Sequence, residues 1–300
     1  MDIFLRLLIN VLEEGFIFGI MAMGVFISYR ILSFPDLSVD GTFPLGACVT
    51  ALLITGGINP WLACVLAFLA GAAAGSITGL LHVRLKITDL LSGILMMTAL
   101  WTVNLLLTGG TAIRQFFGMD TIFNWGPIAL LPDGFRRVRI LIMAFLVMAA
   151  VKLTLDWFFR TRTGLLLRAS GDNGQFVTSL ARDQGKMKIL GLALGNGCAA
   201  LAGSVMAQQT QMADINFGRG MVVLSLASVI IGTSVFRRMS FLRVTTMAVL
   251  GAIFYRVCLS TAMLIGLPTN YVQLLMAAIL TLALVWGRVS EGGGALRRGT

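Results

Sequence analysis

Apolar residues run through this chain in long blocks separated by short polar segments. The blocks are roughly 16 to 24 residues long, close to the ~20 apolar residues with which a helix crosses a ~30 Å hydrocarbon layer. Within them Leu, Ala, Gly and Met follow one another without the period-two alternation of barrel strands. The pattern therefore predicts an all-α fold, a polytopic transmembrane helical bundle.

We expect about nine spans (eight to ten), and we treat residues 1–300 as one transmembrane domain. Two of the connecting loops are long, at 109–138 and 160–188. The first apolar block carries Glu13 and Glu14 and has no small-residue cleavage site, so we expect it to remain as a helix rather than be removed as a signal peptide. The expected spans cover residues 7–28, 42–57, 61–81, 90–108, 139–159, 189–207, 221–235, 244–264 and 270–286.

Composition supports a membrane location. Only 12% of the residues are charged and 57% are hydrophobic, whereas soluble domains carry about 25% charged residues. The net charge of +10 arises from basic residues between the apolar blocks, which favours the positive-inside rule over nucleic-acid binding. The rule predicts an outside N-terminus, a cytoplasmic C-terminus, a cytoplasmic loop at 160–188 and a periplasmic loop at 109–138.

Several kinds of chemistry have no motif in this sequence. The four cysteines lie inside apolar blocks without metal-ligand or disulfide spacing, so we expect no metal site and no cofactor. There is no G-x-x-x-x-G-K-[ST] phosphate loop, so the chain has no ATPase of its own. No G-x-S-x-G or H-E-x-x-H motif is present either, which argues against an intramembrane enzyme.

The segment 33–44 combines helix-breaking residues with acidic ones. Pro35 and Pro44 interrupt a helix, and backbone groups freed at membrane depth must be buried in protein or line a cavity. A broken element that carries Asp36 and Asp40 is typical of a substrate pathway. An ordinary interface loop with two solvated aspartates is the alternative interpretation.

Other polar residues enter the apolar blocks. Asn104 and Asn196 are candidates for solute contact, although hydrogen bonding between helices is their default role. Gln208 begins a polar run that either lines a mouth or forms a hydrated helix end, and the hydrated end is favoured. Arg256 needs a partner that the sequence does not name. The candidate translocation path therefore comprises Pro35, Asp36, Asp40, Asn104, Asn196 and Gln208.

Two of the expected spans share a short internal sequence repeat, referred to below as the echo. Residues 72–76 and 200–204 match at four of five positions, in spans that run in opposite directions in the expected topology. An inverted repeat would produce this match, and so would close helix packing through small residues.

The basic loop 160–188 has amphipathic character. Leu165 to Leu167 supply an apolar face, Gly171 to Gly174 form a turn signal, and a second apolar stretch follows at 176–181. Two short amphipathic helices could dock a partner. Binding of anionic lipid headgroups is the alternative that the six basic residues leave open.

Three stretches of this sequence resemble a known family. They are 34–46 with its Asp36-Leu37-Ser38-Val39-Asp40-Gly41 motif, 91–98, and the run from Arg162 to Gly232. Together they are similar to permease subunits of bacterial ATP-binding-cassette importers of the branched-chain amino acid and ribose class. The segments 167–173 and 191–204 look closest to the aromatic (tryptophan/tyrosine-type) amino acid subgroup. Asp40 stands where sugar permeases commonly have Gly, which weakens a sugar assignment.

The resemblance implies function and partners. It implies import across the bacterial inner membrane of a small polar solute, an amino acid or related compound. It implies a cytoplasmic ATP-binding subunit, an extracytoplasmic solute-binding protein and a second permease copy or homologue. It also implies that loop 160–188 is the coupling element. The candidate ATPase-coupling residues are Thr163, Gly164, Leu167, Arg168, Ala169, Gly171, Asp172 and Asn173.

Two further function classes remain open at this point. A self-sufficient secondary transporter or channel would use Asp36 or Asp40 as an ion-coupling carboxylate. A sugar or nucleoside permease of the same importer class is the other. Which solute is carried is not readable from these residues.

Overall fold

A computed structural model describes residues 2–125, 136–172, 183–236, 239, 242–264, 271, 274–282 and 285. Among these residues, seven helices are long and apolar enough to cross a membrane, and one shorter apolar helix covers Val39–Thr55. The prediction of an all-α polytopic bundle is confirmed. The helices are α1 (Asp2–Phe26) with its π-helical continuation η1 (Ile27–Ile31), α2 (Val39–Thr55), α3 (Pro60–Leu85), α4 (Asp89–Leu107), α5 (Arg136–Phe158), α6 (Arg162–Asp172), α8 (Gln184–Thr210), the 3-10 helix η4 (Ile215–Gly218), α9 (Met221–Val235) and α10 (Val244–Leu264).

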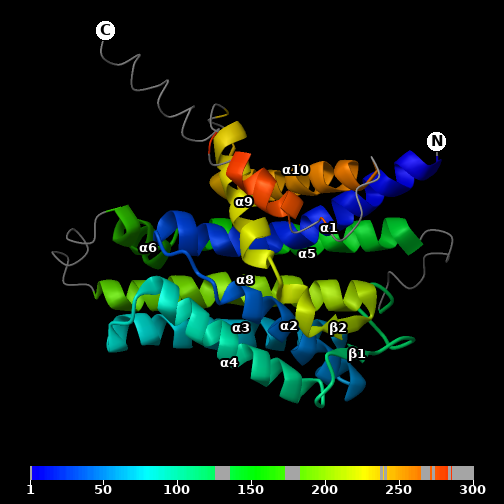
Figure 1. The fold of residues 1–300 in the computed structure, drawn as a ribbon, viewed down its shortest axis with the longest axis horizontal. Helices are drawn as coiled ribbons and strands as arrows, with labels where there is room; N and C mark the ends of the chain where they lie inside the picture. Colours follow the sequence, from blue (N-terminus) through cyan, green and yellow to red (C-terminus); the bar gives the residue numbers. More distant parts are fainter. Residues whose placement is uncertain are drawn as a thin grey trace, which may run out of the picture.

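The helices form stacked layers (Figure 1). α8 lies between the α2–α3–α4 layer and the layer of α1 and α5, while α10 lies beyond α1. α9 runs steeply across the others. α6 lies at one end of the bundle, and the opposite end carries both the N-terminus and, on the other side of α8, the two short strands β1 (Ile113–Gln115) and β2 (Met212–Asp214).

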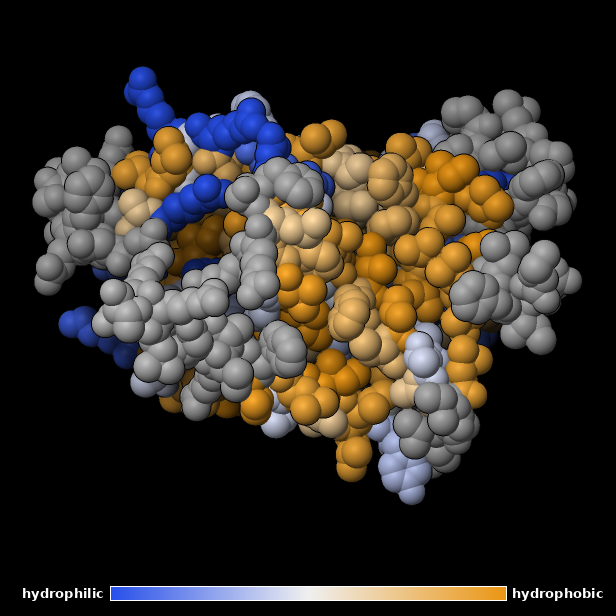
Figure 2. Space-filling view, turned by 90° about the horizontal axis from the view of Figure 1, so that it is seen from above, coloured by the Kyte–Doolittle hydropathy of each residue, from blue (hydrophilic) through white to orange (hydrophobic). Residues whose placement is uncertain are grey.

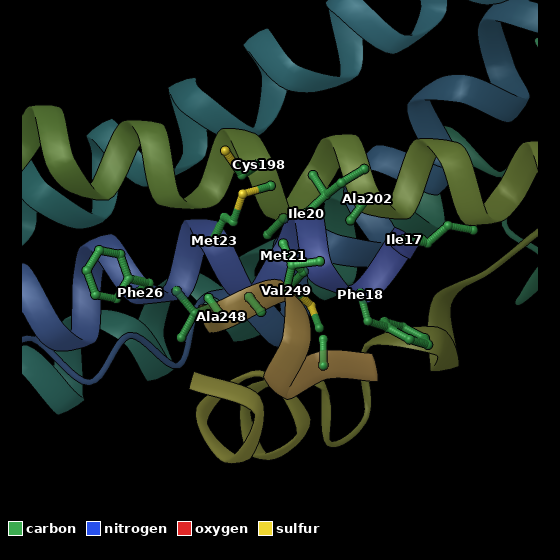
Figure 3. Packing of buried hydrophobic residues seen from close by; sticks show 14 of the residues in the cluster. Ile17, Phe18, Ile20, Met21, Met23, Phe26, Cys198, Ala202, Ala248 and Val249 are labelled. Carbon is green, nitrogen blue, oxygen red and sulfur yellow. The ribbon is translucent and has the colours of Figure 1, made fainter. Parts of the chain in front are cut away.

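The core is built around α1 and α8. Buried side chains of α1 such as Ile17, Met21 and Met23 pack against α8 at Cys198 and against α10 at Val249 (Figure 3). Such all-round burial is the reason the α1 sequence is apolar on every face rather than amphipathic. By contrast, α4 and α5 bury only about a third of their apolar windows, so their remaining surface is available to lipid or to other chains.

Glycines bring α3 and α8 to backbone contact. A Cβ atom added at Gly75 would overlap the carbonyl oxygen of Leu192, and one at Gly71 would lie 2.5 Å from the carbonyl oxygen of Asn196. Gly79 meets Ile189 in the same antiparallel register. The echo at 72–76 and 200–204 therefore lies on two helices that pack directly together, which fits close approach through small residues.

Several expected segments differ in detail. The span expected at 189–207 is part of α8, which begins at Gln184, within the expected loop 160–188. The expected span 42–57 begins earlier, at Val39. Of the expected span 270–286, residues 274–282 are helical. Residues 270, 272–273, 283–284 and 286 lie outside the described residues. The loop 109–138 contains β1, which pairs antiparallel with β2; residues 126–135 are outside the described part. Within loop 160–188 the first expected helix is α6, whereas Asn173 and the stretch 176–181 lie outside the described residues.

Candidate functional site

The first structural feature of the site is a break between α1 and α2. α1 widens into the π-helical turn η1, where the Leu32 amide donates to the carbonyl of Ile27 over 3.1 Å. Ser33 then adopts a left-handed backbone with φ 53°, and helical structure resumes only at Val39. Pro35 lies inside this break. The predicted interruption is present over residues 33–38, because Pro35 cannot donate a helical hydrogen bond. Its expected extension to residue 44 is wrong, since Asp40 and Pro44 already lie inside α2.

A buried hydrogen-bond network holds the break against α8. The carboxylate of Asp36 accepts from the backbone amide and the hydroxyl of Ser38, at 2.9 and 2.6 Å. Its other oxygen accepts from the Asn196 side-chain amide at 2.6 Å. The amide oxygen of Asn196 in turn accepts from the hydroxyl of Thr42 at 2.8 Å and lies 3.0 Å from the hydroxyl oxygen of Ser38. Asp36 is therefore a satisfied, buried carboxylate that ties the break to the middle of α8.

Asp40 bonds a different element. Its carboxylate accepts from the backbone amide of Val222 at 2.7 Å and of Gly220 at 3.4 Å, which are free donors at the start of α9. An acid at this position also favours the positive end of the helix dipole. Pro44 has no backbone N–H, so the carbonyl oxygen of Asp40 receives no hydrogen bond from within α2. Gly218 packs directly against that oxygen, so closely that a Cβ atom there would overlap it.

A cavity of about 380 Å³ opens beside Asp40. Its wall comes from α2, α4 and the segment from η4 to the start of α9. Asn104 is fully buried; its amide nitrogen donates to the carbonyl of Gly41 at 3.1 Å, and its side-chain oxygen has no partner. The residues around the cavity are Asp40, Gly41, Pro44, Met97, Thr98, Trp101, Asn104, Ile215, Gly218, Arg219 and Gly220.

The six predicted path residues thus fall into three places. Pro35, Asp36 and Asn196 belong to the break and its network, while Asp40 and Asn104 meet at the cavity. Gln208 lies elsewhere: it is 1% exposed, accepts from the amide of Ile122 and donates to the sulfur of Cys64. The interpretation of Gln208 as part of a hydrated helix end is wrong, because the segment before α5 folds over it.

A second polar cluster lies between α1 and α10. Arg256 pairs with Glu14, and its guanidinium also lies over the ring of Phe18, 5.1 Å from the centroid. The neighbouring Glu13 accepts from the side chain of Gln209 on α8 at 3.1 Å. The adjacent acids in the first apolar block were visible in the sequence, but their pairing with α8 and α10 was not.

The candidate coupling residues lie on α6, except Asn173, which is outside the described residues. Gly164 and Leu167 face inward, whereas Thr163 and Arg168 are exposed and Ala169 is half-buried. Gly171 packs on the carbonyl of Ile31 at the end of η1, and Asp172 is the last residue of the helix. Leu165, which was predicted as part of an apolar face but not as a coupling residue, is 56% exposed.

The surface separates polar and apolar regions. Figure 2 shows an apolar surface over the middle of the visible face, with most of the strongly hydrophilic residues gathered toward the end where α6 lies. Arg162 and Arg168 of α6 and Arg84 at the end of α3 are exposed basic residues. Such a distribution is typical of a protein embedded in a bilayer with one basic, water-facing end.

Comparison with known proteins adds a family. Residues 7–284 match the family described as the permease component of branched-chain amino acid transport systems. The chain is 38% identical over 283 residues to a tyrosine transport system permease protein of Clostridioides difficile, covering 94% of this chain and 92% of that one. It is 25% identical over 281 residues to the ribose import permease protein RbsC of Escherichia coli K12, covering 93% and 84%.

One solved structure shares the fold. PsaBC from Streptococcus pneumoniae in complex with Fab matches with a TM-score of 0.51 and 15% identity, covering 94% of this chain and 89% of that chain. This likeness supports the helical arrangement alone.

Proposed function

The chain belongs to the permease-component family of branched-chain amino acid transport systems, and from that premise we propose that it is the membrane subunit of an importer for an amino acid, driven by a separate ATP-binding subunit. The similarity to a tyrosine transport permease over nearly the whole chain supports an amino acid as solute. The more distant ribose permease gives a sugar less support. The protein is a multi-pass membrane protein, and we place its N-terminus outside and its α6 end in the cytoplasm.

The observation that carries this proposal is the contact between α6 and the membrane-buried break. α6 buries Leu167, which reaches α8 beside Gly191, and packs Gly171 on the carbonyl of Ile31. A displacement of α6 therefore passes directly to the end of η1 and to Pro35 and Asp36 beyond it. This is the connection that a partner ATPase needs in order to change access to a solute path.

The exposed face of α6 fits a protein groove. Leu165 is an apolar side chain in a water-facing position, flanked by the exposed Arg162 and Arg168. Arg168 is fixed by its position over the Phe159 ring, 4.7 Å from the centroid. An apolar anchor with charges at its rim is the usual composition of a protein-binding surface. We assign the contact with the ATP-binding subunit to Thr163, Arg168, Asp172 and Asn173 together with Leu165.

The candidate path residues have two different roles. Asp36 and Asn196 secure the break to α8, and Asp40 and Asn104 border the cavity through which we route the solute. An extracytoplasmic binding protein delivers that solute, and a second permease copy completes the membrane assembly. The single permease domain spans 1–300, with the coupling loop at 160–188 and the outer loop at 109–138.

Co-purification and transport test the proposal. Arg168→Glu combined with Asp172→Lys should abolish association with the ATP-binding subunit while the chain still inserts in the membrane. Arg84→Glu, an exposed charge reversal outside α6, is the control and should leave association intact. The proposal fails if the purified chain alone, in liposomes, accumulates solute on an ion gradient.

A further inference from the structure

The cavity beside Asp40 has an unusual mixture of groups for a space between transmembrane helices. Its wall carries an acid, Asp40, a base, Arg219, and an aromatic ring, Trp101. Its volume of about 380 Å³ falls within the ~300–1,000 Å³ of small-molecule sites. A purely lipid-facing hollow would have no reason to hold two opposite charges, because charges in hydrocarbon are costly.

The most informative group in this wall is the buried side-chain oxygen of Asn104. Asn104 is 0% exposed, and its side-chain oxygen has no hydrogen-bond partner although its nitrogen is bonded to Gly41. A buried acceptor without a partner costs about 1–3 kcal/mol, so such a group calls for an occupant. The group that satisfies it must be a donor.

The charged groups define the two ends of that occupant. Within the described part of the chain, Arg219 forms no ion pair and Asp40 accepts only from backbone amides. Arg219 is therefore free to take a carboxylate, which a guanidinium binds in bidentate fashion. Asp40 and the Asn104 oxygen together offer a negative and an acceptor group to an ammonium.

The remaining wall is apolar. Met97, Pro44 and Ile215 border the cavity with Trp101, which is 45% exposed. Such a wall suits an apolar or aromatic side chain, and Met contacts aromatic rings favourably. An acid, a base and an apolar wall together match a zwitterion with a large side chain.

We propose that the cavity between α2, α4 and the η4–α9 segment is a binding site inside the membrane domain for a free α-amino acid with an apolar or aromatic side chain. Arg219 binds the carboxylate, Asp40 and Asn104 bind the ammonium, and Trp101 with Met97 contacts the side chain. The inference rests on the proposed function, because it gives the transported solute a resting place. It goes further by assigning the recognition of both charged ends to the membrane subunit itself.

Direct binding tests the site. The complex of this chain with its ATP-binding subunit, in nanodiscs and without binding protein, is titrated with radiolabelled L-tyrosine, L-tryptophan and L-leucine. Saturable binding of at least one of them is expected. Tyramine lacks the carboxylate and 3-(4-hydroxyphenyl)propionate lacks the ammonium, so each should compete at least about tenfold more weakly than L-tyrosine.

Variants locate the binding. Asn104→Leu and Trp101→Leu should each weaken binding about tenfold or more. Trp61→Leu is the matched control, since Trp61 is 41% exposed on α3 and does not border the cavity; it should bind like wild type. Melting curves of the same complexes show whether each variant is folded. Arg219→Gln changes an exposed side chain, so it tests amino acid binding without disturbing the fold.

Two outcomes would overturn the inference. One is the absence of saturable binding by wild type up to millimolar amino acid, and the other is a phospholipid that co-purifies in the cavity and is not displaced by amino acid. ATP-driven uptake from loaded binding protein is measured in parallel. Uptake without binding at the cavity refutes this site and leaves the importer intact, whereas lack of ATP-driven uptake of any amino acid refutes the importer.

Discussion

Glu14 of α1 and Arg256 of α10 form an ion pair inside the bundle, with the guanidinium also stacked over Phe18. Both residues are largely buried, so each neutralises a charge that would otherwise be costly. The pair fastens the central helix α1 to α10 at the midpoint of α1.

Breaking this pair on one side should destabilise the protein strongly. Arg256→Met leaves Glu14 as a buried, uncompensated charge, and we expect a loss of about 3–5 kcal/mol of unfolding free energy. The double variant Glu14→Gln, Arg256→Met should recover most of it. Thermal unfolding in detergent measures both, and a double variant as unstable as the sum of its singles would contradict the coupling.

Asp36 and Asn196 should tolerate an exchange of their side-chain types. Asn196→Leu leaves one oxygen of Asp36 without its donor and should cost about 1–3 kcal/mol. Exchanging both, Asp36→Asn with Asn196→Asp, keeps one amide and one carboxylate facing each other. The exchanged protein should melt at a higher temperature than Asn196→Leu. Equal melting temperatures of these two variants would show that the contact between the two side chains is unimportant.

The role of Asp40 can be divided between its charge and its helix contact. Asp40→Asn keeps an acceptor for the Val222 amide, so the fold should be maintained, whereas Asp40→Leu removes the cap and should cost about 0.5–2 kcal/mol. Transport should fall in both variants. Wild-type uptake by Asp40→Asn would reduce Asp40 to a helix cap.

Gly71 should not accept a methyl group. Its Cβ would overlap the side chain of Ala200 and crowd the carbonyl of Asn196, so Gly71→Ala should destabilise by about 1–3 kcal/mol. Gly56→Ala is the control, because Gly56 has φ −81° and its nearest neighbour would lie 3.3 Å away. Thermal unfolding separates the two; equal curves would mean that α3 and α8 can move apart at little cost.

The outward face of α6 should govern association without affecting folding. Leu165→Lys changes an exposed side chain and should weaken binding of the ATP-binding subunit while melting stays unchanged. Leu167→Ala empties a position that is 0% exposed and should cost about 2–5 kcal/mol. If Leu165→Lys co-purifies normally with the ATP-binding subunit, the contact lies elsewhere on the chain.

The positions of the helices were largely predictable, because an apolar block of membrane length has few other options. The break at Pro35 was also predictable, since proline acts through local geometry. Partners across the bundle were not: Arg256 could have met any acid, and only the packing of α1 on α10 selects Glu14. Gln208 was misjudged because nothing near it in the sequence shows that the segment at Ile122 covers it.

The functional positions divide in the same way. Asp36 and Asp40 stand four residues apart and look equivalent in the sequence, yet one bonds α8 and the other bonds α9. The strand β1 was missed because three residues of Ile-Arg-Gln carry little signal without β2. The steep direction of α9 follows from packing on α1 and α10 rather than from its composition.

The glycine contacts between α3 and α8 limit how this molecule can move. Helices that touch backbone to backbone, as at Gly71 and Gly75, cannot slide past each other there by small adjustments of side chains, because no side chain separates them at these positions. α3 and α8 must therefore travel as one rigid unit. Any alternation between outward and inward access has to occur at other borders in the bundle, and the border of α4 with α2, where the cavity opens, offers the space for it.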